Sequence, residues 1–283
     1  MTKIGCHVSI AGGLENAPKR AHQLGCGCYQ MFSRSPQGGK AVELTAEVIE
    51  KFKKANQEKQ FTDFYFHAPY YINLGSVSPK IRHSSGAIIL DELRRADKLG
   101  ARFVVTHLGS AKGWENKKEA MEKTIKILRE YLEKYQGQTQ LLLENSAGSG
   151  EILGANFSEL GEIISQVASK KIGGICLDTQ HSFASGWDWR EGENFAKKLS
   201  LLEGELQGAT IRLLHINDSQ TEFNSKKDRH AHLGEGQIGL PGFANWVEYA
   251  QKNNLDLILE TAPDKIEKDL ELLMEMRGVA EGL

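Results

Sequence analysis

The chain is poor in cysteine, and this shortage narrows the classes of protein it can belong to. The only four cysteines among 283 residues are Cys6, Cys26, Cys28 and Cys176. Their spacing lacks the paired C-x-x-C pattern of a zinc ribbon. So few cysteines in a chain long enough to bury a large core do not predict a disulfide framework. We expect Cys176, which lies in an apolar run, to be a small buried side chain.

Long apolar runs and linkers are also missing. No stretch approaches the roughly 18 apolar residues that span a membrane. The opening MTKIGCHVSI has no basic segment followed by a long apolar core, as a secretory signal would have. We therefore expect a cytoplasmic location. No Pro- or Ser-rich linker divides the chain, so we expect a single domain over residues 1–283.

The sequence has little excess charge of either sign. Its formal net charge is −2 and its pI is near 6.5, which at first argues against a nucleic-acid partner. Bound metals would change this balance, because three divalent cations would shift the net charge from −2 to +4. A metal-loaded cleft could then attract phosphates although the bare chain is slightly acidic.

What the chain does contain is a recurring pattern of short apolar runs, most of them apolar throughout. Such runs are typical of parallel strands that are covered on both faces. They lie near residues 3–8, 27–32, 62–67, 102–107, 140–144, 173–178, 211–216 and 256–260. Helical patterns between them cover 84–100, 115–137, 156–169 and 240–254. Eight strands alternating with helices predict an α/β fold, a (β/α)8 TIM barrel. A doubly wound open sheet is the alternative, but it would not bring so many strand ends to one point.

The apolar runs end in histidines or carboxylates. Together with a cluster that follows the seventh run, they supply nine candidate metal ligands: His67, His107, Glu144, Asp178, His181, His215, Asp228, His230 and Glu260. A single histidine at a strand end is usually a hydrogen-bonded loop residue, so the interpretation depends on their recurrence. Successive ligands at the strand ends are 34 to 45 residues apart, and in a barrel they would converge at the C-terminal ends of the strands. Glu144 and Glu260 directly follow the apolar runs LLL and LIL, where metal ligation would offset the cost of a buried carboxylate.

The chemistry of these candidates indicates which metals would bind. Imidazole and carboxylate ligands without thiolate suit zinc, manganese or iron. Nine ligands are too many for one tetrahedral zinc ion with an open position. Three metals with one or two bridging carboxylates would account for them, and a close metal pair suits phosphoryl chemistry.

The segments around these ligands resemble the endonuclease IV family of zinc-dependent apurinic/apyrimidinic (AP) endonucleases. The similar segments are IGCHVSIAGG, HAPYYINL, LLLENSAGSG, CLDTQHSFASG, LLHINDSQ and NSKKDRHAHLGEGQIG, and they run from about residue 3 to 262. The resemblance implies a TIM barrel with three zinc ions, for which Mn²⁺ or Fe²⁺ could substitute. It also implies DNA repair by cleavage on the 5′ side of an abasic site, which leaves a 3′-hydroxyl and a 5′-deoxyribose phosphate. Removal of blocking groups from 3′ ends is implied as well.

The resemblance also assigns the ligands. His67, His107 and Glu144 would hold the first metal. The second would be held by Glu144, as a bridge, with Asp178, His215 and Glu260. The third metal would be held by His181, Asp228 and His230. Glu144 and Glu260 are the expected catalytic carboxylates, and a metal-activated water would attack the phosphorus without a separate general base.

Residues that contact DNA are expected on the rim, the loops that surround the predicted metal centre. Tyr70 and Tyr71 either pack their loop or, as the resemblance implies, insert into the duplex at the lesion. Tyr71 stands where a smaller apolar residue is common in the family, and Gln37 where some members carry an inserting arginine. Arg34 and Lys40 are expected to contact phosphates. Arg229, with Lys226 and Lys227, is either a solvated charge run or a contact to the DNA backbone.

Other histidines and glycines have lesser expected roles. We expect His7 to support the site without ligating a metal, and we leave His22, His83 and His232 unassigned. Gly234 and Gly236 would allow a close approach of the backbone. The expected partner is double-stranded DNA with abasic sites or blocked 3′ ends, bound by a monomer.

Two other functions remain open. A sugar isomerase or epimerase on the same barrel would use one divalent metal and about four ligands. A metal-dependent DNA-binding module without catalysis would explain the rim but not a bridged metal pair.

Overall fold

Eight parallel strands close into a barrel in the computed structural model, which describes residues 1–39, 41–190 and 194–281. The barrel strands are β1 Ile4–His7, β2 Cys28–Phe32, β3 Phe64–His67, β4 Phe103–Thr106, β5 Gln140–Glu144, β6 Ile172–Asp178, β7 Ile211–His215 and β10 Leu257–Leu259. Their order around the barrel is β1-β10-β7-β6-β5-β4-β3-β2. The predicted TIM barrel is confirmed, and each of its eight strands overlaps a predicted apolar run.

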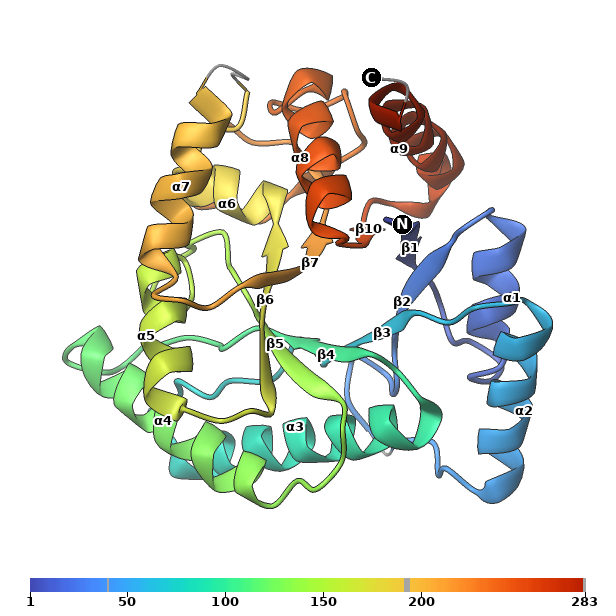
Figure 1. The fold of residues 1–283 in the computed structure, drawn as a ribbon. Helices are drawn as coiled ribbons and strands as arrows, with labels where there is room; N and C mark the ends of the chain where they lie inside the picture. Colours follow the sequence, from blue (N-terminus) through green and yellow to red (C-terminus); the bar gives the residue numbers. More distant parts are fainter. Residues whose placement is uncertain (40, 191–193, 282–283) are drawn as a thin grey trace.

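Helices form a ring outside the strands (Figure 1). They are α1 Asn16–Gln23, α2 Ala46–Glu58, α3 Pro79–Leu99, α4 Lys117–Glu133, α5 Phe157–Val167, α6 Thr179–Ser185, α7 Phe195–Glu205, α8 Leu240–Asn253 and α9 Ile266–Glu281. Helix α3 begins five residues before the predicted range 84–100, because Pro79 fits the first turn, where its missing N–H is not needed. Across the described residues, none of the helices has the length and apolar character needed to cross a membrane.

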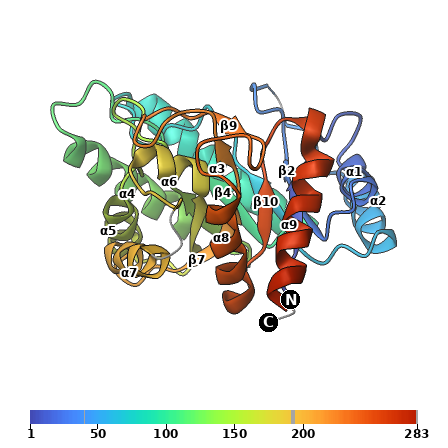
Figure 2. The same ribbon diagram turned by 90° about the horizontal axis from the view of Figure 1, so that it is seen from above.

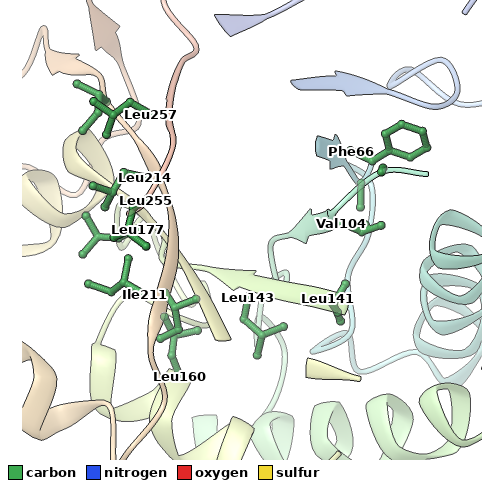
Figure 3. Close-up of a cluster of buried hydrophobic side chains, with 14 of the residues drawn as sticks. Phe66, Val104, Leu141, Leu143, Leu160, Leu177, Ile211, Leu214, Leu255 and Leu257 are labelled. Carbon is green, nitrogen blue, oxygen red and sulfur yellow. The ribbon is translucent and has the colours of Figure 1, made fainter. Parts of the chain in front are cut away.

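The core has two layers because successive side chains of a strand point to opposite faces. The inner layer fills the barrel with Cys28, Tyr65, Phe103, Val105, Leu142, Cys176, Leu213 and Ile258. The outer layer packs strands against helices, and Figure 3 shows part of it, including Leu143, Leu177 and Leu214. Cys176 is fully buried, as expected, and all four cysteines are free thiols.

Two features complete the end of the barrel that carries the site. The short strands β8 Asp218–Ser219 and β9 His230–Ala231 pair antiparallel in the excursion between β7 and α8. Figure 2 shows β9 at one end of the barrel and both chain termini at the other. Helix α6 starts directly at the end of β6, where the side chain of Asp178 caps it by accepting the N–H of His181 at 2.7 Å. This cap fixes a strand-end carboxylate and the histidine one turn later in a single rigid unit.

Candidate metal centre

The strand-end candidates face the inside of the barrel because each follows an inner-layer residue by two positions. Residues two apart in a strand share a face, so Glu144 lies above Leu142, and His215 above Leu213. The same two-residue offset from an inner-layer residue applies to His67, His107, Asp178 and Glu260, so these side chains also face the inside of the barrel. Asp178 and His215 are also direct partners in the β6–β7 register. The register of the barrel therefore collects the candidates above its inner core.

In the part of the chain that the structure describes, three groups of side chains could hold a metal, and Glu144 belongs to two of them. The first group is His67, His107 and Glu144. Oε2 of Glu144 lies 2.9 Å from Nε2 of His67 and 3.3 Å from Nε2 of His107. The carboxylate is fully buried, so its two oxygens must find partners inside the protein.

The second group consists of Glu144, Asp178, His215 and Glu260. Here Glu144 presents its other oxygen, Oε1, at 3.0 Å from Nδ1 of His215. The same nitrogen lies 3.1 Å from Oε2 of Glu260. Glu144 thus turns one oxygen to each group, which is the geometry of a carboxylate that bridges two metal ions.

The third group contains Asp178, His181 and His230. Asp228 lies beside it, with Oδ2 at 3.3 Å from Nε2 of His181 and Oδ1 at 3.5 Å from Nε2 of His230. The structure therefore brings together the three residues assigned to a third metal. It adds Asp178, whose Oδ2 is 3.7 Å from Nε2 of His230, next to them.

Two observations show that these residues fit metal ions. Nε2 of His230 is buried without a hydrogen-bond partner in the described residues, although carboxylate oxygens surround it. Nδ1 of His67 and of His181 each lie against a backbone carbonyl, at 2.7 and 3.1 Å. A neutral histidine that donates one N–H to a carbonyl leaves its other nitrogen free for a metal. The donor set of imidazoles and carboxylates suits zinc, with manganese or iron as substitutes.

The electrostatics of the centre also call for positive charge. Burial disfavours the charged form of Glu144, but His107 and His215 outweigh it and hold the pKa of this carboxyl well below its usual range. Burial likewise opposes the imidazolium of His181, yet Asp178 and Asp228 raise its pKa well above the usual value. Metal ions would supply the same positive charge that protons supply in their absence.

An open cavity of about 460 Å³ exposes the three groups to solvent. Its rim includes Tyr70 and Arg229. Tyr70 is 68% exposed and Tyr71 40%, which is unusual for large aromatic side chains. The ring of Tyr70 stands edge-on against Phe32 at 5.2 Å between centroids, so this contact holds the ring although most of the side chain is exposed.

Arg34 does not lie where it could make the expected contact with phosphates. Its side chain is buried, and its guanidinium forms ion pairs with Asp91 and Glu92 of helix α3. Glu92 is fully buried, so Arg34 is committed to neutralising it and anchors the loop after β2. Gln37 is exposed on that loop, and Lys40 lies outside the described residues.

The basic run beside the third group is exposed. Arg229 donates to the carbonyl of Asp228, and Lys226 donates to the carbonyl of Ser185 at 2.7 Å. Lys227 is also exposed. Arg229 lines the cavity, and the two lysines lie exposed before it in the chain.

Two residues that orient the candidate ligands, Asn217 and Gln30, were missed by sequence reasoning. The amide of Asn217 donates to Oδ2 of Asp178 at 2.6 Å and accepts the backbone N–H of Glu260 at 2.8 Å. Gln30, fully buried in β2, lies between His215 and Glu260. The signal for both was a polar amide in or beside an apolar run. His7 lies outside the three groups, with Nδ1 at 3.1 Å from Nε2 of Gln30, and burial lowers its pKa to about 4.

Comparison of the chain with known proteins identifies the family to which it belongs. A family model described as a xylose isomerase-like TIM barrel matches residues 18–276. The chain is 34% identical over 280 residues to a probable endonuclease 4 of Cenarchaeum symbiosum (strain A), covering 98% of this chain and 99% of that protein. It is 37% identical over 269 residues to a probable endonuclease 4 of Aquifex aeolicus (strain VF5), covering 92% of each.

Solved structures agree with these sequence comparisons. The crystal structure of endonuclease IV from Thermus thermophilus superposes with a TM-score of 0.83 at 30% identity, covering 99% of this chain and 100% of that chain. A D-tagatose 3-epimerase-like protein superposes with a TM-score of 0.76 at 20% identity, covering 99% of each chain, and shares the fold alone. The relatives above 30% identity span nearly the whole of both chains, and the protein belongs to the endonuclease IV family.

Proposed function

We propose that the protein is a DNA-repair AP endonuclease that hydrolyses the phosphodiester on the 5′ side of an abasic site. The products would be a 3′-hydroxyl and a 5′-deoxyribose phosphate, and the same centre would clear blocked 3′ ends. The observation that carries the proposal is Glu144, which is shared by two ligand groups while a third group lies beside them in one open cavity. Three zinc ions would occupy these groups.

The carboxylates and His215 would hold the first two metals in defined places. Glu144 would bridge the first two metals, and Glu260 would complete the second with Asp178 and His215. Bound divalent metals would lower the pKa of water towards about 7 and offset charge on the phosphate. The buried carboxylates and imidazoles would hold this charge in a fixed arrangement, so that little reorganisation is needed during the reaction.

The rim would supply the selectivity for damaged DNA. Tyr70 and Tyr71 would enter the duplex at the lesion, where their exposed rings can stack on neighbouring bases. A flipped abasic nucleotide has no base to unstack, so its extrusion costs less than that of an intact nucleotide. Arg229 would contact the DNA backbone from the mouth of the cavity, and Gln37 would approach the duplex from the loop after β2.

The rival function, a sugar isomerase or epimerase on the same barrel, accounts for less of the centre. It would use one metal and leave His181, Asp228 and His230 without a role. A DNA-binding module without catalysis would leave the bridging geometry of Glu144 unexplained.

Incision of a duplex with a single synthetic abasic site tests the proposal most directly. We expect one cut on the 5′ side of the site, with the product ends mapped as 3′-hydroxyl and 5′-deoxyribose phosphate. The same duplex with an intact nucleotide is the control and should remain whole. Metal analysis of the same sample should give close to three metal ions per chain. A reproducible value near one, with no incision, would favour the isomerase.

A further inference from the structure

Gln30 connects two candidate ligands of the second metal through one fully buried side chain. It lies in β2 and faces the barrel interior, two positions after Cys28. Its Nε2 donates to Oε1 of Glu260 at 2.7 Å, and its Oε1 lies 2.9 Å from Nε2 of His215. Gln30 belongs to none of the three groups, so it would act on the metal only through these two neighbours.

The chemistry of the three side chains fixes the orientation of the Gln30 amide and the nitrogen of His215 that donates to it. An ionised carboxylate can only accept hydrogen bonds, so the amide nitrogen of Gln30 must face Glu260. The amide oxygen must then face His215, and it can only accept. Nε2 of His215 therefore carries the proton that this oxygen accepts, and Nδ1 is the nitrogen that would face a metal in the second group.

This arrangement distinguishes His215 from three other histidines of the centre. His67, His181 and His230 each place Nδ1 near a backbone carbonyl, at 2.7, 3.1 and 3.4 Å. Each would therefore bind metal through Nε2. His215 has the opposite orientation, with Nδ1 facing Glu144 and Glu260, and its outer partner is the side chain of Gln30. A backbone carbonyl cannot be removed by substitution, whereas this amide can.

We propose that Gln30 is a positioning residue for the second metal, which holds His215 as an Nδ1 ligand and turns Oε2 of Glu260 to the same ion. The inference rests on the proposed metal centre, but not on the identity of the substrate. Partners of metal-ligating side chains are typically worth about 10- to 100-fold in metal affinity. Loss of Gln30 should therefore weaken one metal of three.

The wild-type protein provides the first test, through the nitrogen resonances of its histidines. In zinc-loaded protein labelled with ¹⁵N-histidine, long-range proton–nitrogen correlations distinguish Nδ1 from Nε2 ligation. We expect His215 to coordinate through Nδ1 and to keep a proton on Nε2, while His67 and His181 coordinate through Nε2. Coordination of His215 through Nε2 would overturn the proposal without any variant being made.

Two substitutions separate the two contacts. Gln30→Leu has a similar volume and removes the hydrogen bonds of the amide to His215, Glu260 and His7. One zinc of three should therefore bind about 10- to 100-fold more weakly, and His215 should lose its fixed tautomer. Gln30→Glu still accepts the proton of His215 but sets a second carboxylate against Glu260. It should keep the tautomer of His215 and still weaken that zinc. Three zinc ions bound with unchanged affinity in Gln30→Leu would contradict the proposal.

Asn56→Leu is the matched control for the loss of a buried amide. Asn56 accepts the hydroxyl of Tyr29, the neighbour of Gln30, at 2.7 Å and has no contact with the centre. It should lower stability while three zinc ions remain bound with unchanged affinity. All of these measurements are made without DNA, so a protein that binds three metals but does not incise abasic duplex would refute the proposed function and leave the role of Gln30 intact.

Discussion

The buried carboxylate of Asp218 accepts the backbone N–H of Gly236 at 3.1 Å. The same carboxylate also accepts the N–H groups of Gly234, Ile238 and Gly239, at 3.0, 2.8 and 3.3 Å. A Cβ on Gly236 would lie 2.5 Å from Oδ1 of Asp218, so only glycine allows this approach. Asp218 thus fixes residues 234–239, which directly follow the β9 strand that carries His230 and pairs with β8.

Asp218→Asn should therefore loosen the third ligand group. The amide would place N–H groups against backbone N–H donors, and we expect a loss of about 1–3 kcal/mol in the free energy of unfolding. Metal content should fall from three ions towards two. Denaturant titration and metal analysis measure both effects. Asp264→Asn, an exposed carboxylate nearby, is the control and should change neither; unchanged stability and metal content in Asp218→Asn would contradict the assignment.

Glu260→Gln tests the second group with little change of shape. The fold should persist, because Glu260 is partly exposed at the cavity while the inner core lies below it. Incision of abasic duplex should fall by about 100-fold or more, since a metal held correctly is worth several kcal/mol in the transition state. Single-turnover incision rates and circular dichroism measure the two properties. An incision rate equal to that of the wild type would show that Glu260 is not one of the catalytic carboxylates.

The rim tyrosines should contribute to binding but not to metal content. Stacking on an aromatic ring is worth about 1–3 kcal/mol per base, so Tyr70→Ala with Tyr71→Ala should weaken binding of abasic duplex by at least about 10-fold. Fluorescence anisotropy with a labelled duplex measures the affinity. Tyr131→Ala, an aromatic residue on the outer helix α4, is the control. If the double variant binds as tightly as the control does, the tyrosines do not enter the duplex.

Substitution of Arg34 should lower the stability of the fold and should not act through a contact to DNA. Removing it leaves the buried carboxylate of Glu92 with less compensation, and we expect Arg34→Ala to lower the free energy of unfolding by about 3 kcal/mol. Lys54→Ala, which breaks the exposed pair with Glu58, should change it by less than about 0.5 kcal/mol. A stable Arg34→Ala protein with weakened DNA binding would restore the phosphate contact expected from the sequence.

Gln37→Ala should weaken DNA binding at unchanged stability.

The barrel and the convergence of the candidate ligands could be predicted because both follow from local rules. Apolar runs of strand length indicate parallel strands, and a two-residue alternation decides which side chains face inward. The place of Arg34 could not be predicted, since its partners lie on α3, 57 and 58 residues away. Gln30 was missed for the same reason: its meaning depends on His215 and Glu260, which are far away in sequence. Long-range pairing of polar groups leaves no periodic trace in a single sequence.

The inner-layer offset ties coordination to strand register. Because Glu144 shares a face with Leu142, insertion of one residue between them would turn the carboxylate outward against the helices while β5 could still pair with its neighbours. The barrel would tolerate such a change better than the metal centre would. Length variation is thus open to the loops of this protein and closed to the last residues of its strands.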